Sequence, residues 1–225
     1  MPHPLDRPIW TALATRQQGL AFGDERARRI DPAYGVFAVA RDASEDSREA
    51  LTALVRAHGD AALVEAEPPD LPAGLEVVSR AVLWQMLAED LKLVPPDFEW
   101  VDLAEADAPQ MLALAELTRP GPFSSRTHRL GDFVGVKRDG ELIAMAGERL
   151  KPDGFTEVSG VCVRPGDQGR GYAAGLMSVV AERIVARGET PFLHVYDHNA
   201  RAIAVYQALG YRLRRKMAMV VVRAP

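Results

Sequence analysis

A strand, a glycine-rich turn and the start of a helix follow one another between Glu157 and Leu176, and this succession constrains the fold more than any other part of the chain. Residues 157–163 are rich in valine and small side chains, which is typical of a buried strand. The Arg-Pro-Gly-Asp run at 164–167 ends that strand, because proline and glycine interrupt regular structure. After it, apolar side chains recur at helical spacing from Ala173 to Ile184. We therefore expect the turn to lead directly into a helix N-terminus.

The turn has the properties of an anion-binding site. Backbone N–H groups in the first turn of a helix lack a partner within the helix, and the helix dipole adds about half a positive charge at that end. Gly169 and Gly171 carry no side chain that would block a ligand. Binding of a phosphate or pyrophosphate is therefore favoured. The alternative is that the segment is only a tight turn between strand and helix. The pattern is neither a Walker loop nor a dinucleotide fingerprint, because it lacks the residues that define them.

Two blocks of the sequence resemble the GNAT (Gcn5-related) N-acetyltransferase superfamily. Gln168-x-x-Gly171-x-Ala173 is similar to that family's acyl-CoA pyrophosphate loop. Residues 199–211 are similar to its second block, with Asn199, Tyr206 and Gly210-Tyr211 at matching positions. The blocks come in the family's order, and the stretch from about 118 to 211 looks most like the FR47-like branch. The resemblance covers roughly residues 97–225.

The resemblance implies an acetyl-CoA-dependent N-acetyltransferase in which an amine attacks the thioester directly. Val161, Cys162 and Val163 would present backbone groups to the pantetheine arm, on a strand that usually carries a bulge in this family. The pyrophosphate would be held mainly by the backbone of the turn, namely Gln168, Gly169, Arg170, Gly171, Tyr172 and Ala173. Asn199 would bind near the pantetheine arm. Acetyl-CoA is thus the expected co-substrate, and no metal is expected.

Two side chains are candidates for the chemistry. Tyr206 matches the family's proposed proton donor to the leaving thiolate, and a phenol with a pKa near 10 suits that role; otherwise it is a core aromatic residue. Glu157 matches the spacing of a glutamate base, and an apolar cleft would raise its pKa; otherwise it is a solvated residue at a strand end. Asn199 precedes Tyr206 by two helical turns, on the same face, and is also an ordinary helix cap.

Other polar residues have simpler interpretations. Cys162 is expected to be a small buried residue rather than a nucleophile. His194 and His198 lack companions for a zinc site. Arg119 and Arg126 lie in the loop where this family builds its acceptor pocket, and they either bind an acidic acceptor or carry solvated surface charge.

The predicted fold class is α/β with a mixed sheet. Residues 97–225 are predicted to form the catalytic GNAT domain, and residues 1–95 a smaller α/β domain whose β-α-β order suggests a degenerate GNAT half. Leu93-Val-Pro-Pro-Asp97 is the expected boundary, because its double proline stiffens the chain. Strands are also expected near residues 75–78, 211–213 and 217–222, with an apolar segment of ambiguous type at 82–87.

Charge and composition limit the partners. The net charge of −4 argues against non-specific binding to nucleic acid. Residues 155–225 hold ten basic and five acidic residues, a balance of +5 that suits a polyanionic cofactor, although chance alone could produce it. No apolar run reaches 18 residues, the N-terminus does not resemble a signal peptide, and there is a single cysteine, so a cytoplasmic protein without a membrane partner is expected.

The acceptor is left open by the sequence. A small-molecule amine such as an amino acid or a polyamine and a peptide terminus are all compatible with it. A catalytically silent acyl-CoA sensor and an ester-forming enzyme are the two alternative functions. The first 95 residues could bind substrate, form a homodimer face or brace the second half.

Overall fold

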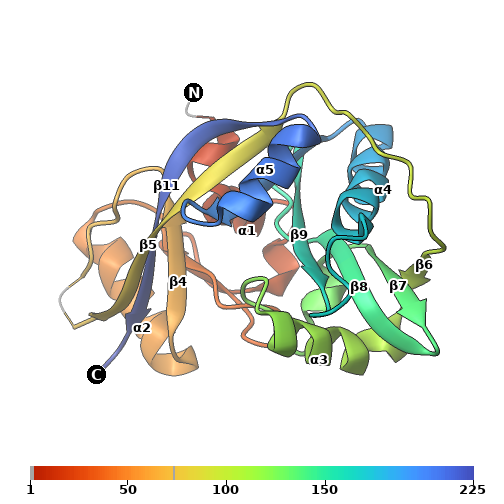
Figure 1. Ribbon diagram of the computed structural model, residues 1–225. Helices are drawn as coiled ribbons and strands as arrows, with labels where there is room; N and C mark the ends of the chain where they lie inside the picture. Colours follow the sequence, from red (N-terminus) through yellow and green to blue (C-terminus); the bar gives the residue numbers. More distant parts are fainter. Residues whose placement is uncertain (1–2, 73) are drawn as a thin grey trace.

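An eight-stranded mixed sheet runs through the computed structural model, which describes residues 3–72 and 74–225 (Figure 1). The strand order is β4-β11-β5-β10-β9-β8-β7-β6, and a separate three-stranded sheet has the order β1-β2-β3. Only the β9–β10 pair of the large sheet is parallel; its other neighbouring strands are antiparallel. Helices pack on these sheets, so the predicted α/β class with a mixed sheet is confirmed.

The second half of the chain has the element order that the GNAT resemblance implies. Its elements are β6 (Val101–Leu103), η3 (Glu105–Asp107), α3 (Ala108–Thr118), η4 (Thr127–Leu130), β7 (Phe133–Arg138), β8 (Glu141–Glu148), β9 (Phe155–Val163), α4 (Tyr172–Ala186), β10 (Thr190–Tyr196), α5 (Ala200–Ala208) and β11 (Tyr211–Arg223). The predicted Asp-Gly hairpin is present between β7 and β8, where Asp139 and Gly140 have φ of 52° and 81°. Gly188, with φ of 76°, follows the end of α4.

The first half begins with η1 (Pro4–Asp6) and then has a helix, a small sheet, a second helix and two further strands. These elements are α1 (Pro8–Ala14), η2 (Gln18–Leu20), β1 (Ala21–Gly23), β2 (Ala27–Ile30), β3 (Ala38–Ala40), α2 (Glu45–His58), β4 (Ala61–Glu65) and β5 (Glu76–Ala88). Helix α2 has the predicted limits: the Ser44 side chain caps its start and Gly59, with φ of 84°, ends it. Strands β1 and β2 are short and were not predicted.

Much of the element order is common to the two halves, although β6 and α5 of the second half have no counterpart in the first. In each half a helix precedes three antiparallel strands, and a second helix and a further strand follow: α1, β1–β3, α2 and β4 correspond to α3, β7–β9, α4 and β10. The third and fourth strands of each half run parallel, through one bridge between Phe37 and Ala62 and through the pairing of Phe155–Glu157 with Thr190–Phe192. This correspondence supports the hypothesis that the first half is a reduced copy of the second.

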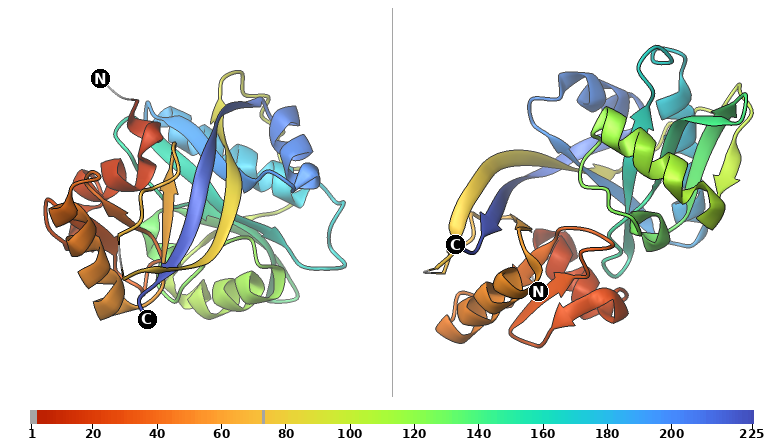
Figure 2. Two further views of the ribbon diagram at one scale, coloured as in Figure 1. Left: turned by 90° about the vertical axis from the view of Figure 1, so that its left-hand side faces the viewer. Right: turned by 90° about the horizontal axis from the view of Figure 1, so that it is seen from below.

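The last strand of each half crosses over to the other. Strand β5 lies between β10 and β11, while β11 lies between β4 and β5. Strands β5 and β11 are 13 residues each and form the long ribbon that connects the two halves in Figure 2. Residues 76–78 and 82–87, which were predicted as separate segments, therefore belong to one strand, β5. The prediction of two strands at 211–213 and 217–222 is wrong, because β11 continues through a bulge at Arg214.

The sheet and the core both cross the predicted boundary at residues 93–97. Strand β5 precedes that boundary, yet both of its neighbours follow it. One apolar core combines buried side chains from the two sides, including Leu5, Phe37, Leu83, Phe192 and Met217. A second core lies between α4, α5 and the strands of the second half. The division into two domains stays a prediction, and the two parts share a sheet.

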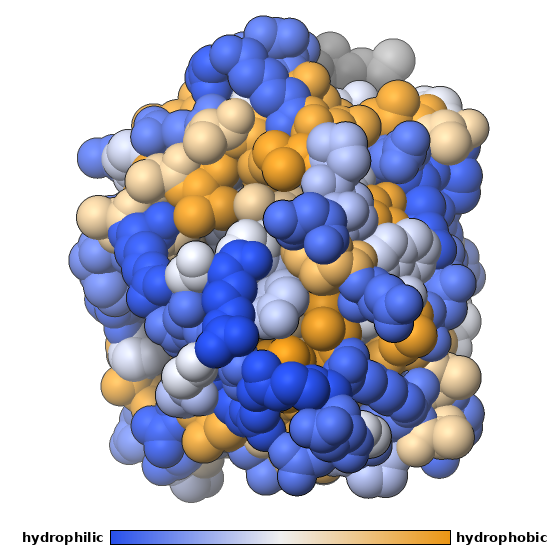
Figure 3. Space-filling model, turned by 45° about the vertical axis from the view of Figure 1, so that its right-hand side comes forward, coloured by the Kyte–Doolittle hydropathy of each residue, from blue (hydrophilic) through white to orange (hydrophobic). Residues whose placement is uncertain are grey.

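The surface in Figure 3 shows apolar areas interrupted by strongly hydrophilic side chains. None of the helices in residues 3–72 and 74–225 combines the length with the apolar character that a membrane-spanning segment needs.

The shared sheet predicts that residues 97–225 do not fold stably alone. Without β5, the edge of β10 and the full length of β11 would lose their central partner, and unpaired edges favour aggregation. We expect this fragment to show no cooperative thermal transition by circular dichroism, and co-expression with residues 1–96 to restore one. A fragment that unfolds cooperatively near the temperature of the intact chain would contradict this.

Candidate active site

A cavity of about 480 Å³ opens where β9 and β10 separate. Ten of the eleven residues predicted to bind the cofactor line it, and Arg170 is the exception. These ten residues come from the end of β9, the glycine turn, the start of α4 and helix α5: Val161, Cys162, Val163, Gln168, Gly169, Gly171, Tyr172, Ala173, Asn199 and Tyr206. The fold thus brings both sequence blocks to one hollow, which is large enough for a small ligand.

The separation of the two parallel strands has a local cause. Strand β9 has a bulge at Gly160 and Val161, which together lie opposite Ala146, and Gly160 has a φ of 63° that favours glycine. Pairing between β9 and β10 ends at Glu157 and Phe192, before the bulge. The backbone of residues 161–163 is therefore not paired with β10 and borders the cavity instead. This is the geometry expected for a slot that receives a pantetheine chain.

The glycine turn presents unpaired amides. Gly169 and Gly171 have φ of 80° and 79°, and a Cβ atom placed on either glycine would meet open space. No side chain caps α4. Within the described residues, no backbone acceptor receives a hydrogen bond from the N–H groups of residues 169–174. Since α4 has 15 residues, its dipole adds positive potential at the same place. The turn therefore has the unpaired amides that an anion would need.

Helix α5 holds the side chain at the start of this turn, and Asn199 caps that helix. The Gln168 side-chain oxygen accepts a hydrogen bond of 2.8 Å from Arg201 of α5. Asn199 caps α5, because its side chain accepts a hydrogen bond from the Ala202 amide at 3.2 Å. Asn199 therefore has the structural role that its position allowed, and it also borders the cavity.

Tyr206 projects from α5 and lines the cavity. Burial raises the pKa of its phenol to about 12. The phenol is therefore protonated throughout the physiological range and is available as a proton donor. It also packs against the core next to Tyr211, with ring centroids 6.4 Å apart.

Glu157 differs most from its predicted environment. Its side chain is fully buried and does not line the cavity. Both carboxylate oxygens are bound by Arg149, at 2.9 and 2.8 Å, and His194 Nδ1 lies 2.8 Å from one of them. Burial alone would raise the pKa of Glu157, but the Arg149 guanidinium and His194 hold it well below its usual range. The expected upward shift of this pKa is therefore wrong.

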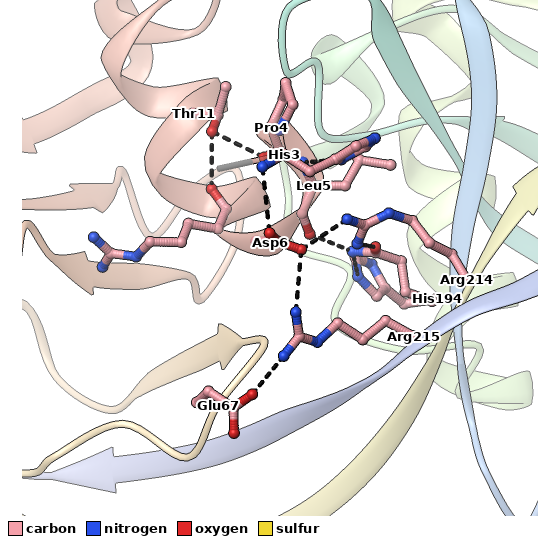
Figure 4. Close-up of polar contacts among 11 residues, drawn as sticks. His3, Pro4, Leu5, Asp6, Thr11, Glu67, His194, Arg214 and Arg215 are labelled. Carbon is pink, nitrogen blue, oxygen red and sulfur yellow. Dashed lines mark hydrogen bonds and ion pairs between the residues drawn. The ribbon is translucent and has the colours of Figure 1, made fainter. Parts of the chain in front are cut away.

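A chain of polar contacts leads from Glu157 across the sheet to the N-terminal segment. His194 of β10 lies 3.1 Å from the Gln85 amide of β5, and Gln85 accepts a hydrogen bond from Arg214, the bulged residue of β11. Arg214 reaches Asp6 at 2.7 Å, and Arg215 lies 3.5 Å from the same carboxylate (Figure 4). Both ring nitrogens of His194 thus have protein partners.

The remaining polar candidates have structural surroundings. Burial raises the pKa of the Cys162 thiol to about 11, so the thiolate is scarce at neutral pH. His198 is exposed and next to Asp197, at 3.4 Å. Within residues 3–72 and 74–225, no three His, Cys, Asp or Glu side chains come together in a way that could hold a metal ion.

The sequence left open whether the first half contributes to this cavity, and it identified no residue that would do so. Phe37 near β3, Val64 of β4 and Leu83 of β5 line it together with residues of the second half. These side chains are ordinary apolar residues without a motif, so only the crossing of strands between the halves reveals their position.

Comparison with known proteins relates this chain to a protein family. The pattern of the family described as FR47-like protein matches residues 133–220. A putative acetyltransferase from the GNAT family of Novosphingobium aromaticivorans is 43% identical in sequence, covers all of both chains and superposes with a TM-score of 0.90. A GCN5-related N-acetyltransferase of Kribbella flavida is 21% identical, covers 98% of this chain and 96% of its own, and has a TM-score of 0.63, which shows likeness of fold.

A curated relative matches over a shorter length. Mycothiol acetyltransferase of Streptomyces avermitilis is 36% identical over 81 residues, which are 35% of this chain and 26% of that enzyme. The likeness to the Novosphingobium protein extends over the whole chain at high identity. The glycine turn, the separated strands and this full-length match together show that the chain belongs to the GNAT family of acetyltransferases and is an acyltransferase.

Proposed function

We propose that this protein transfers an acetyl group from acetyl-CoA to the nitrogen of a small amine, which attacks the thioester directly in a ternary complex. The observation that carries the proposal is the row of unpaired amides at the start of α4, beside a cavity that extends to Tyr206. The amides of residues 169–174 would bind the pyrophosphate of CoA. The backbone of residues 161–163 would bind the pantetheine arm as an added strand, with Asn199 at the other side of the slot.

The protein contributes positioning and charge stabilisation to this reaction. Holding the thioester beside the amine replaces a bimolecular encounter with an oriented one. The departing thiolate would take a proton from Tyr206, whose high pKa keeps the phenol in its acid form. Arg170 is exposed and does not line the cavity, so in this proposal only its backbone amide contacts the pyrophosphate.

The amine must lose a proton, and the cavity offers no carboxylate suited to take it. Among the described residues that line the cavity, Asp167 is the only one with a carboxyl group, and hydrogen bonds from Arg164 and Arg138 lower its pKa. Glu157 is buried behind Arg149. We infer that the amine proton leaves through water, and that Glu157 is a positioning residue for Arg149 and His194 rather than the base.

A charged residue placed in the glycine turn tests whether the turn binds the pyrophosphate. We expect Gly171→Glu to weaken acetyl-CoA binding about 100-fold, or ~2.7 kcal/mol, because a carboxylate would lie next to the pyrophosphate. Gly188→Glu is the matched control: its φ of 76° is close to the 79° of Gly171, and both positions face open space. The backbone strain, ~1–2 kcal/mol, is therefore similar in both variants. If calorimetry shows that the two variants bind acetyl-CoA equally well, the glycine turn does not bind the pyrophosphate.

Tyr206→Phe separates acid catalysis from binding. We expect kcat to fall by roughly 10²–10⁴-fold while acetyl-CoA affinity hardly changes. Because the pKa of Tyr206 is about 12, ionisation of this phenol should not reduce the wild-type rate below about pH 10. Steady-state kinetics and calorimetry on both proteins test this. An unchanged kcat would remove Tyr206 from the mechanism.

Glu157→Gln tests the positioning role. The change leaves the buried Arg149 without its counter-charge, so we expect the free energy of unfolding to fall by about 3–5 kcal/mol. Removing both charges, with Glu157→Gln and Arg149→Met, should cost less than the single change. Chemical denaturation of the three proteins measures this.

The pH dependence of this stabilisation has a defined sign. The folded-state pKa of Glu157 is depressed, so its contribution is present above the unfolded pKa of about 4.3 and is lost as the pH falls below it. The pH profile of kcat/KM should follow the acceptor amine in both wild type and Glu157→Gln. If Glu157→Gln instead keeps full stability and its kcat/KM no longer rises with pH as that of the wild type does, Glu157 is the base.

A further inference from the structure

The cavity extends beyond the residues assigned to acyl-CoA, and this extension is mostly apolar. Its walls combine side chains of both halves, namely Phe37, Val64, Leu83, Leu150 and Met219, with Tyr196 beside them. The same cavity of about 480 Å³ is bordered at one end by the residues assigned to the cofactor and at the other by these side chains. The space that remains suits a small acceptor with an apolar side chain rather than a folded protein segment.

One guanidinium in this region keeps unused hydrogen-bond donors. Arg149 lines the cavity with a side chain that is only 11% exposed, and its Cζ lies 4.9 Å from the centre of the Phe37 ring. Its Nε and Nη2 atoms bind Glu157. The Nη1 atom of Arg149 has no hydrogen-bond partner among the described residues. It is also not completely buried. A ligand in the cavity can therefore reach it.

A second arginine faces the same space from the neighbouring loop. Arg119 follows α3 with a left-handed φ of 49° and lines the cavity together with residues 118–122. The guanidinium of Arg149 is close to this loop, because a Cβ atom added to Gly121 would lie 3.9 Å from Nη1. Arg126, the other loop arginine singled out in the sequence, does not line the cavity.

The charge of the lining excludes a polycationic acceptor. Asp167, its only carboxyl residue, is already bound by Arg138 and Arg164. No carboxylate is left to hold a second ammonium group, whereas Arg119 and Arg149 repel one. A carboxylate would satisfy the free Nη1 donors and offset the charge of Arg119.

We propose that the acceptor is a small apolar α-amino acid whose carboxylate is bound by Arg149 and Arg119 and whose side chain packs against Phe37, Val64, Leu83 and Met219. This inference rests on the proposed function of the same cavity. The reaction forms an N–C amide bond and breaks the C–S bond of the thioester. The ammonium releases one proton to water before attack and a second after it. The thiolate takes one proton from Tyr206, which water then reprotonates.

Wild-type protein with acetyl-CoA and a panel of amines tests the substrate class by thiol release. L-leucine carries all the proposed features, L-leucinamide lacks the negative charge, isoamylamine lacks the carboxyl group and cadaverine is a dication. We expect kcat/KM for L-leucine to exceed those for the other three by about 100-fold. Equal or faster turnover of leucinamide, isoamylamine or cadaverine would overturn the proposal.

A pair of loop variants locates the recognition. Arg119→Gln should raise KM for L-leucine by about 10–100-fold and narrow its advantage over leucinamide, with little change in acetyl-CoA affinity. Arg126 is in the same loop but does not line the cavity, so Arg126→Gln should leave the kinetic constants for both substrates unchanged. Equal behaviour of the two variants would contradict carboxylate recognition by Arg119.

Calorimetry with acetyl-CoA separates the two levels of inference. If acetyl-CoA binds but no L-amino acid with an apolar side chain releases thiol above background, the acceptor proposal is wrong and the cofactor assignment stands. If acetyl-CoA does not bind, the proposed function is wrong and the acceptor proposal falls with it.

Discussion

A buried carboxylate holds the centre of this molecule in place. Glu157 is fully enclosed, and a charge in that position is tolerated only when it is paired and hydrogen-bonded. Arg149 and His194 meet this requirement, and Gln85, Arg214 and Asp6 continue the chain of contacts. The chain connects four adjacent strands, β9, β10, β5 and β11, with the N-terminal segment. The crossed strands and the end of the cavity proposed for the acceptor therefore share one set of polar contacts.

The position of the candidate active site follows from the place where this sheet opens. Pairing between β9 and β10 stops next to Glu157, and the Gly160 bulge turns the following backbone toward the cavity. Helix α4 begins at the same edge with uncapped amides. A slot without the helix end would lack positive potential, and a helix end without the slot would bind only a phosphate. Their combination suits a long cofactor with a diphosphate in its middle.

Local patterns could be predicted from the sequence, and long-range ones could not. The glycine turn, the Asp-Gly hairpin and the Ser44 cap each depend on a few neighbouring residues whose chemistry determines the backbone. The β5–β11 exchange depends on pairing across more than 100 residues, so Val64 and Leu83 gave no sign of lining the cavity. The shift of the Glu157 pKa was predicted in the wrong direction, because its partners are not sequence neighbours. His194 lies 37 residues away, and Arg149 directly follows strand β8.

The repeated order of elements raises the question of why one half would bind acyl-CoA and the other would not. Helix α2 corresponds to α4, but the Ser44 side chain caps its first turn, which also carries Glu45 and Asp46. A hollow of about 410 Å³ lies at the matching place, and Asp42, Glu65, Glu67 and Asp70 are among the residues that line it. A diphosphate at the start of α2 would meet the Ser47 amide already bound by Ser44 and the like charge of Glu45 and Asp46, although Arg7 and Arg215 also line the hollow. The first half instead supplies Phe37, Val64 and Leu83 to the other cavity, where they would form one wall of the proposed acceptor site.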